Sequence, residues 1–390
     1  MKLYKTKKDP ELYYYYNAQK QKKWMYRHRY YDDLGYRREK SKQNFEKEAD
    51  AYRELLKIKT DTANGLVKQV EYSGILISEW LDIWYETNQN EWEIPTRMHR
   101  KRVITLHLKP LLGKYKLADL DNATYRRVFI NKTLKSFKPS TVAEYHRLFK
   151  IAVNAAIDNE IISRNRFKKI KIDQDEPENN FLTPDELSEF LSYTKKYERI
   201  TIYTLTLLLA YTGFRKGEAL GLTWNDINFK NKTITVNCTR DQHGVRSPKT
   251  KRSYRTIHVD QLVLVQLESY KLWSKKVKLS FGDHLKKEDF IFISTKGAPL
   301  YHNNINTRFR RILKKNPDFT VITPHGLRHT HATILISKRI PVRTIADRLG
   351  NTPQMIYDVY GHSFEALELE SVNAFSDSLK EVGGTSGGGF

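Results

Sequence analysis

Three stretches of sequence indicate the fold and the chemistry of this chain. The first reads Thr212-Gly-Phe-Arg215-Lys-Gly-Glu218, and the second, more than a hundred residues later, reads Thr323-Pro-His325-Gly-Leu-Arg328. The third is Tyr360, which follows Arg328 by 32 residues. A guanidinium offers a fixed fork of donors to phosphate oxygens, and a tyrosine hydroxyl can attack phosphorus to form a covalent intermediate. Together the stretches predict a site that holds and attacks a phosphodiester.

The composition points to a nucleic-acid partner. The 390 residues carry a formal net charge of +23, and residues 1–74, 75–172 and 173–390 are each basic by themselves. Positive charge of this size is an argument about partners rather than about fold, and polyphosphate is the partner that it fits best. We therefore expect contact with nucleic acid along much of the chain.

The composition also argues against several other classes of protein. No apolar run reaches 18 residues, so neither a membrane span nor a secretory leader is predicted. The single cysteine, Cys238, can form neither an internal disulfide nor a Cys-rich metal site. With 39% hydrophobic residues the chain has enough apolar material for folded cores, so we expect folded domains in a reducing cytosol.

Residues 1–65 are predicted to form a small three-stranded sheet with one helix. The aromatic stretches 13–16 and 23–30, followed by 37–45, are typical of strands. The apolar spacing within 46–59 favours a helix, and 60–65 has the composition of a linker.

Residues 72–172 are predicted to form a helical domain. One amphipathic helix opens at Ile77, and a second covers 96–108 and is stopped by Pro110 and Gly113. A third runs from the capping residue Ser140 to about Asn159. The acidic, proline-containing segment 173–180 is the clearest domain linker in the chain.

Residues 181–382 are predicted to form a mixed α+β domain, so the whole chain is expected to be multidomain and mainly α. Helices are expected from Pro184, over 200–214, and from Thr352 through Tyr360. Strands are expected at 233–237 and 254–259, joined by a polar loop that holds Lys249. A last helix is expected at 369–379, and the Gly-rich tail 383–390 is expected to be disordered.

These motifs resemble the tyrosine recombinases, specifically the integrases of temperate phages and of conjugative transposons of Gram-positive bacteria. Residues 212–222 match the family box Thr-Gly-x-Arg-x-x-Glu-x-x-x-Leu, and His325-x-x-Arg328 matches the second box. Lys249 lies in a Pro-Lys-Thr hairpin like the family's catalytic lysine, and Tyr360 has the family's spacing after Leu349-Gly350. The resemblance covers nearly the whole chain: it implies an arm-site DNA-binding domain at 1–65, a core-binding domain at 72–172 and a catalytic domain at 181–382.

The resemblance implies DNA strand transfer without a metal, a cofactor or ATP. Tyr360 would attack the scissile phosphate, releasing a 5′-hydroxyl and leaving a 3′-phosphotyrosyl bond. Arg215 and Arg328 would neutralise the non-bridging oxygens as charge develops. Lys249 would protonate the leaving oxygen, and His325 would hydrogen-bond the phosphate and assist proton movement.

Three more residues have implied supporting parts. Glu218 lies one helical turn after Arg215 and can orient a neighbouring basic group. The family usually has histidine directly after Leu-Gly, but this chain has Asn351, which can donate a hydrogen bond and cannot shuttle a proton near neutral pH. We hypothesise that Asn351 acts as a donor only. The alternatives are a slower enzyme, compensation by His362, or a disabled enzyme.

The implied partner is double-stranded DNA with core and arm attachment sites, clamped between the middle and C-terminal domains. We expect a dimer on the core site and a tetramer in the synapse, acting at the nucleoid in a bacterial cytoplasm. An excision factor and a host DNA-bending protein are implied by the resemblance alone. The basic residues expected to contact DNA are Lys23, Arg27, Arg29, Arg37, Arg100, Lys101, Arg147, Lys168 and Lys169.

Competing interpretations remain for single residues and for the whole chain. Tyr357 competes with Tyr360 as nucleophile, and Lys251 competes with Lys249. His325 and His329 have the spacing of zinc-binding helices, but the glutamate that normally follows the first histidine is missing. The rival functions are a dimer resolvase of the same chemistry, a type IB topoisomerase, and a DNA-binding protein whose catalytic activity is weakened or lost.

Overall fold

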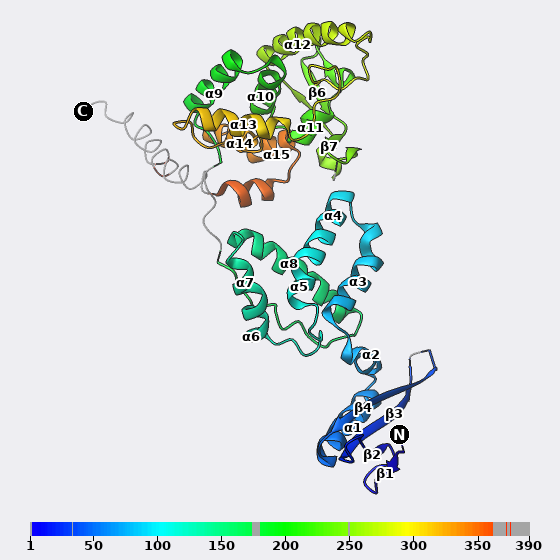
Figure 1. Ribbon diagram of the computed structural model, residues 1–390. Helices are drawn as coiled ribbons and strands as arrows, with labels where there is room; N and C mark the ends of the chain where they lie inside the picture. Colours follow the sequence, from blue (N-terminus) through cyan, green and yellow to red (C-terminus); the bar gives the residue numbers. More distant parts are fainter. Residues whose placement is uncertain are drawn as a thin grey trace, which may run out of the picture. The chain divides into compact units, whose positions relative to one another are not determined.

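The computed structural model describes residues 2–32, 34–173, 180–248 and 250–361, together with 372 and 375. They belong to two compact units, Met1–Pro177 and Glu178–Phe390 (Figure 1). Lys249, His362, the tail 383–390 and most of the expected helix 369–379 lie outside the described residues. Within the described part of the chain, no helix is both long and apolar enough to cross a membrane.

The first unit begins with an antiparallel sheet in the order β1-β2-β3-β4. Its strands are β1 (Tyr4–Lys5), β2 (Leu12–Tyr16), β3 (Lys22–Tyr31) and β4 (Arg37–Phe45). The three expected strands are confirmed, and the two-residue strand β1 adds a fourth. Helix α1 (Glu48–Ala63) packs Ala51 and Leu55 against Leu12 and Tyr26.

Helix α1 is longer at its C-terminal end than the sequence suggested, so the predicted linker 60–65 is largely helical. The physical reason is a contact with the sheet. The hydroxyl of Thr62 lies 3.0 Å from His28 Nε2 on β3 and also donates to the carbonyl of Ile58 (2.9 Å). This contact between distant residues stabilises the last turn, which is polar in sequence.

The rest of the first unit is helical. Its α-helices are α2 (Val67–Glu71), α3 (Ile77–Asn88), α4 (Ile94–Val103), α5 (Lys109–Leu112), α6 (Asn122–Tyr125), α7 (Asn131–Leu134) and α8 (Pro139–Asp158). Two π-helical turns, Ile104–Leu108 and Arg126–Ile130, and two 3-10 turns, Tyr72–Gly74 and Gln89–Glu91, connect them. Their shared core contains Trp80, Leu81, Phe129 and Phe149.

Two predicted helix boundaries in this region were wrong. The helix expected over 96–108 continues to Leu112 and ends at the expected stop, Gly113. It passes Pro110 because a wider π turn precedes the proline and places it in the first turn of α5, where no N–H donor is needed. Helix α8 begins at Pro139 with Lys138 as its N-cap, so Ser140 lies inside the first turn. The fixed φ of proline suits it to the first helical position.

The second unit surrounds a buried central helix, α10 (Ile200–Thr212), which contacts α9 (Pro184–Tyr197), α12 (Gln261–Ser280) and α14 (Gly326–Ser337) (Figure 1). The remaining elements are α11 (Lys216–Gly221), α13 (Asn304–Lys315), α15 (Val342–Leu349), the 3-10 turns Trp224–Asp226 and Lys251–Ser253, and a helical stretch at 353–361. A three-stranded sheet has the order β5 (Ile227–Asn228), β6 (Thr233–Val236), β9 (Arg255–His258).

The helices expected from Pro184, over 200–214 and from Thr352, and the strands expected at 233–237 and 254–259, are confirmed, and one hairpin was missed. Strands β7 (Thr239–Asp241) and β8 (Gly244–Arg246) pair across a tight turn in which Gly244 has a φ of +105°. Three-residue polar strands lack the hydrophobic alternation on which the sequence argument depends. Helix α9 begins at Pro184 as expected, and Thr183 before it accepts from the backbone N–H of Glu186.

Candidate active site

The backbone between α10 and α11 sets the position of Arg215. Helix α10 ends at Gly213, whose φ is +65°. A Cβ at this position would lie 2.5 Å from Leu349 Cδ2, so only glycine fits both the conformation and the space. Two residues later Arg215 is the N-cap of α11, and its backbone N–H donates to Glu218 Oε2 (2.9 Å).

The side chain of Arg215 is held along one edge. Nη1 donates to Glu218 Oε1 (2.8 Å), and Nη2 donates to Asn351 Oδ1 (2.7 Å). Glu218 is buried, whereas the Arg215 side chain is 37% exposed. Arg215 is therefore oriented by the protein and still open to an anion arriving from solvent.

Arg328, on α14, is the buried guanidinium of the site. Only 3% exposed, it donates from Nη1 to the Gly213 carbonyl (2.9 Å) and from Nη2 to the Leu349 carbonyl (2.8 Å). Burial and the charge of Arg215 lower its pKa to about 9, so it remains protonated at neutral pH. Since a guanidinium has five N–H donors, these two bonds leave others for phosphate oxygens.

Tyr360 is packed into a small apolar cluster beside these charges. It is 4% exposed and lies with Ile345, Leu349 and Ile356. Burial raises the pKa of its hydroxyl, and the positive charges of Arg328 and Arg215 act in the opposite direction. The competing Tyr357 is 50% exposed. Two arginines that lie far from Tyr360 in the chain thus act electrostatically on this tyrosine.

The two histidines of the second box lie on the same side of the site. The rings of His325 and His329 are 4.9 Å apart, and the rings of His329 and Tyr360 are 5.5 Å apart, so His329 is the direct neighbour of the tyrosine. His325 is open to solvent, yet desolvation by the surrounding protein and the nearby charges of His329 and Arg328 lower its pKa to about 4. At neutral pH the His325 ring is therefore uncharged and carries one nitrogen without a proton.

Most of the candidate catalytic residues come together in this one place. Those that share contacts or electrostatic interactions there are Arg215, Glu218, His325, Arg328, Asn351 and Tyr360. Lys249 and His362 lie outside the described residues. Asn351 accepts a hydrogen bond from Arg215 through its carbonyl oxygen, which leaves its amide N–H groups as donors.

Sequence reasoning missed two arginines that support the site. Arg255, on β9, donates from Nη2 to Glu218 Oε2 (2.9 Å), and its side chain is 6% exposed. Arg348, on α15, donates from Nε to His331 Nε2 (3.0 Å) and from its two Nη atoms to the carbonyls of His258 and Tyr211. A signal for the first was present in the sequence: Arg255 alternates with Thr256 and shares its strand face with buried Ile257.

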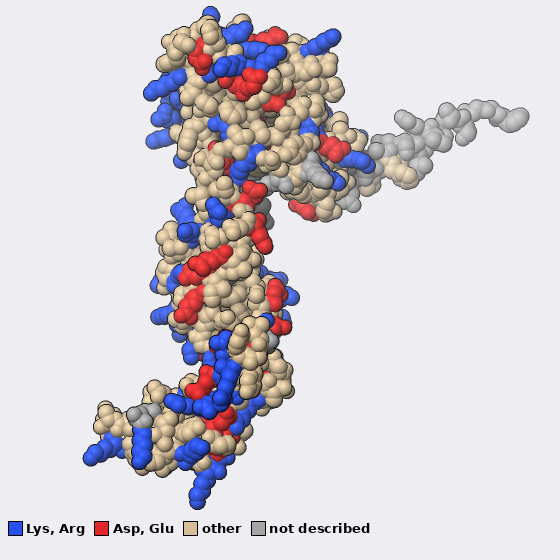
Figure 2. Space-filling view, turned by 90° about the vertical axis from the view of Figure 1, so that its right-hand side faces the viewer, with Lys and Arg blue, Asp and Glu red and all other residues tan. Residues whose placement is uncertain are grey.

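The basic residues expected to contact DNA are distributed over the first unit. Arg27 and Arg29 alternate along β3 with buried His28 and Tyr30, and both lie near Glu39 across the sheet. Arg100 stacks over Trp92 (4.1 Å from the ring centre). The exposed members are Arg29, Arg37, Lys101, Arg147, Lys168 and Lys169. On the face seen in Figure 2, Lys and Arg side chains are spread over both units with Asp and Glu among them.

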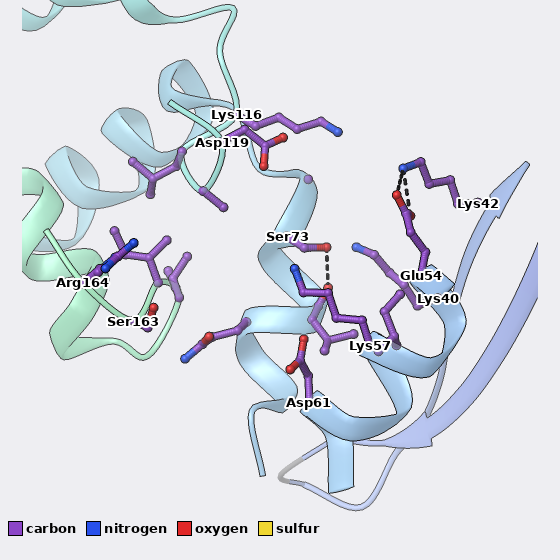
Figure 3. Close-up of a pocket in the computed structure, with 18 of the residues that line it drawn as sticks. Lys40, Lys42, Glu54, Lys57, Asp61, Ser73, Lys116, Asp119, Ser163 and Arg164 are labelled. Atoms are coloured by element: carbon purple, nitrogen blue, oxygen red, sulfur yellow. Dashed lines mark hydrogen bonds and ion pairs between the residues drawn. The ribbon is translucent and has the colours of Figure 1, made fainter. Parts of the chain in front are cut away.

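A cavity of about 660 Å³ in the first unit is lined by none of the candidate catalytic residues. It lies between α1 and β4 on one side and 161–167 on the other (Figure 3). Its basic residues, including Lys40, Lys57 and Lys116, are interleaved with Glu54, Asp61 and Asp119. The lining has mixed charge and contains none of the motif residues of the candidate active site.

Comparison with known proteins agrees with this geometry. The model of the phage integrase family matches residues 180–366, and the model of the phage integrase N-terminal SAM-like domain matches residues 76–134. The chain is 30% identical over 300 residues to the ICEBs1 integrase of Bacillus subtilis (strain 168), with 72% of this chain and 77% of that protein covered. The chain belongs to the phage integrase family.

Other members of the family extend the comparison. The transposase from transposon Tn916 of Enterococcus faecalis is 24% identical, with 70% of this chain and 68% of that protein covered. The Tn1549 transposon integrase in complex with transposon right end DNA has the same fold, with a TM-score of 0.66, 22% identity, and coverage of 77% of this chain and 100% of that one. The chain is thus an integrase of the tyrosine recombinase type found in phages and conjugative transposons, and a DNA recombinase.

Proposed function

We propose that this integrase cleaves and rejoins duplex DNA through a covalent bond between Tyr360 and DNA, and so moves a phage or another mobile element. The Tyr360 oxygen attacks the scissile phosphorus, the bond to the 5′-oxygen breaks, and a 3′-phosphotyrosyl bond forms. The tyrosine proton passes to a neutral base, for which His325 is the candidate. The leaving 5′-oxygen takes a proton from Lys249. Rejoining reverses these steps, with a 5′-hydroxyl of the partner strand as nucleophile.

The observation that carries the proposal is the convergence of Arg215 and Arg328 on Tyr360. Both guanidiniums are oriented by protein groups before any substrate arrives, and preorganised donors are most effective where charge develops in the transition state. Their positive charge also favours the tyrosinate form, which is the better nucleophile.

We further propose that Asn351 donates a hydrogen bond to the scissile phosphate. Its carbonyl oxygen is engaged by Arg215, so the amide N–H groups are the part of the side chain suited to an anion. Asn351→His is expected to keep or raise the cleavage rate. A large loss of cleavage in this variant contradicts the donor role.

The proposed DNA partner is a core site bound by two protomers and brought into a tetrameric synapse, with arm sites bound by the N-terminal sheet. The support is the basic surface of the first unit together with related structures: a lambda integrase tetramer bound to a Holliday junction has the same fold, with a TM-score of 0.57, 18% identity, and coverage of 89% of this chain and 97% of that one. Affinity should fall steeply with salt, by a log–log slope of about −0.9 per neutralised phosphate. Action in the bacterial cytoplasm and the use of an excision factor or a host DNA-bending protein belong to the same proposal.

The test uses a nicked core-site duplex that loses a short 5′-hydroxyl fragment after cleavage, which prevents religation. A covalent protein–DNA band on a denaturing gel is expected for the wild-type chain, absent for Tyr360→Phe and retained for the control Tyr357→Phe, one helical turn earlier. Tight binding without a band would favour the DNA-binding protein without catalytic activity. Relaxation of supercoiled DNA without sequence preference would favour a topoisomerase.

A further inference from the structure

Arg255 occupies an unusual place for an arginine on a short strand. Its guanidinium makes three hydrogen bonds to different segments: Nη2 to Glu218 Oε2 (2.9 Å), Nε to the Arg348 carbonyl (2.7 Å) and Nη1 to the Ser253 carbonyl (3.0 Å). The side chain is 6% exposed. Because Nε, Nη1 and Nη2 all donate to protein groups, this buried arginine can act only on its neighbours in the protein. Those neighbours therefore indicate its role.

The contacts of Arg255 lie next to two of the segments that carry candidate catalytic residues, those of Arg215 and Asn351. Its guanidinium stacks 5.1 Å from the ring centre of Phe214, the residue before Arg215. A Cβ on Gly350, the residue before Asn351, would lie 2.8 Å from Arg255 Nη1, so this glycine leaves room for the guanidinium. Arg255 therefore packs against the ring of the residue before Arg215 and close to the backbone of the residue before Asn351.

Glu218 connects Arg255 to Arg215. Its carboxylate is buried and receives Nη1 of Arg215 on one oxygen, and Nη2 of Arg255 with the backbone N–H of Arg215 on the other. Burial by itself raises the pKa of Glu218, but the pKa is held below its ordinary value by the hydrogen bond and charge of Arg255 and by the charge of Arg215. One buried carboxylate is thus shared between two guanidiniums.

Sharing this carboxylate matters because Arg215 has to serve a phosphate as well. A buried carboxylate with a single cationic partner binds that partner tightly, since an unpaired buried charge is costly. With Arg255 as a second partner, Glu218 orients Arg215 but does not fully neutralise the positive charge of Arg215. The partly exposed guanidinium of Arg215 then remains available to a phosphate oxygen.

We propose that Arg255 is a positioning residue for catalysis: by sharing Glu218 with Arg215 and packing against Phe214 and Gly350, it aligns Arg215 and Asn351 for the scissile phosphate. This inference rests on the proposed function. Arg255 lies outside the motifs on which the proposed function is based, and its substitution is expected to change the rate of cleavage.

The test is a cycle of variants on the full chain, read as the single-turnover rate of covalent complex formation on the nicked core duplex. Protein is in saturating excess, so that DNA affinity does not enter the rate. Arg255→Gln is expected to slow cleavage by about tenfold to a hundredfold, the cost of misplacing a catalytic group, while the Kd for the duplex stays within about twofold. In a Glu218→Gln background, where no buried negative charge has to be shared, Arg255→Gln is expected to cost less than about threefold.

Arg348→Gln is the matched control. Arg348 is likewise a well-bonded arginine of the second unit, with carbonyl and imidazole partners and no bond to Glu218 among the described contacts. A purely structural loss should slow cleavage by the same factor whether position 218 is Glu or Gln. The control should therefore be additive with Glu218→Gln, whereas Arg255→Gln should not be.

The outcomes separate the two proposals. If the wild-type chain forms no covalent complex, the proposed function fails and this inference fails with it. If the wild type is active and Arg255→Gln costs the same factor in both backgrounds, the inference alone is overturned. If Arg255→Gln does not fold, Arg255→Lys carries the same cycle, because lysine keeps the charge and cannot reproduce the three-way fork; an equal loss in both backgrounds again overturns the inference.

Discussion

The arginines of the candidate active site and those on the N-terminal sheet of this integrase differ in how they are held. In the second unit Arg328 is 3% exposed and bound to two backbone carbonyls, and the Arg255 side chain is 6% exposed and bound to three groups. On the sheet of the first unit the Arg29 side chain is 55% exposed and pairs with Glu39 at the surface. The same kind of side chain is therefore buried and bonded on several sides in one region, and exposed to solvent with a single surface partner in the other.

The difference separates arginines that are suited to stabilising a transition state from arginines that contribute only to DNA affinity. A buried guanidinium costs desolvation free energy, so it persists only where protein groups hold it in one geometry. That geometry is what a transition state requires. Surface arginines contribute affinity and salt dependence through many replaceable phosphate contacts. Four predictions test this division, in decreasing order of expected effect.

The largest effect is expected for Arg328→Lys. Lysine keeps the charge but cannot bridge the carbonyls of Gly213 and Leu349 while also meeting a phosphate, so single-turnover cleavage should fall by at least about a hundredfold. Arg311→Lys, at an exposed position on α13, is the control and should stay within about twofold of wild type. Equal rates for the two variants would remove the distinction between buried and surface arginines.

Gly213→Ala tests the backbone at the end of α10, where the Gly213 carbonyl accepts a hydrogen bond from Arg328. The new Cβ meets Leu349 Cδ2 at 2.5 Å and His331 Cδ2 at 2.9 Å, and the residue has positive φ. We expect a loss of about 3 kcal/mol in the free energy of unfolding, from steric overlap added to backbone strain. Gly282→Ala shares the positive φ and has nothing within 4 Å, so thermal unfolding should reveal a cost of only about 1 kcal/mol. Similar losses at both positions would show that backbone strain alone matters.

A smaller effect is expected from pH. Burial, together with the charge of Arg348 for His331 and of Lys150 for His146, lowers the pKa of each histidine to about 4. Because the unfolded state binds these protons first, stability is complete above about pH 6.5 and declines as the pH falls toward 4, by about 1–3 kcal/mol per histidine. Denaturant unfolding at several pH values should show the decline, with a shallower slope for His331→Gln. An unchanged slope in that variant would show that His331 does not titrate in this range.

The smallest effect is expected on the sheet. Arg27→Ala and Arg29→Ala should each weaken binding of an arm-site duplex by a few fold and reduce the log–log salt slope by about 0.9, without changing cleavage of the core substrate. Arg53→Ala on α1, whose arginine is 81% exposed, is the control and should leave both quantities unchanged. If the Arg27 or Arg29 variant lost cleavage of the core substrate, these surface arginines would contribute to catalysis, contrary to the prediction.

Much of the fold was predictable because the signals are local. The start of α9 at Pro184, the buried helix α10 and strands β6 and β9 follow from the fixed φ of proline and from hydrophobic periodicity, which act over a few residues. The C-terminal extension of α1 was not predictable, since its last turn depends on a contact between Thr62 and His28. For the site, the sequence predicted which residue types are present and how far apart they lie in the chain, but not how their side chains contact one another. Nothing local to Arg255 identifies Glu218 as its partner.

The sequence by itself determined the candidate residues, since Arg215, Arg328 and Tyr360 stand in motifs whose residue types suit phosphate chemistry at any distance. The tertiary structure alone decided which groups are buried, and thereby how Glu218 is shared, why Arg328 is held between two carbonyls, and how Asn351 directs its carbonyl oxygen to Arg215. The physical reason is that desolvation and hydrogen-bond geometry depend on neighbours far apart in the chain, whereas the chemistry of a side chain is carried by its own atoms.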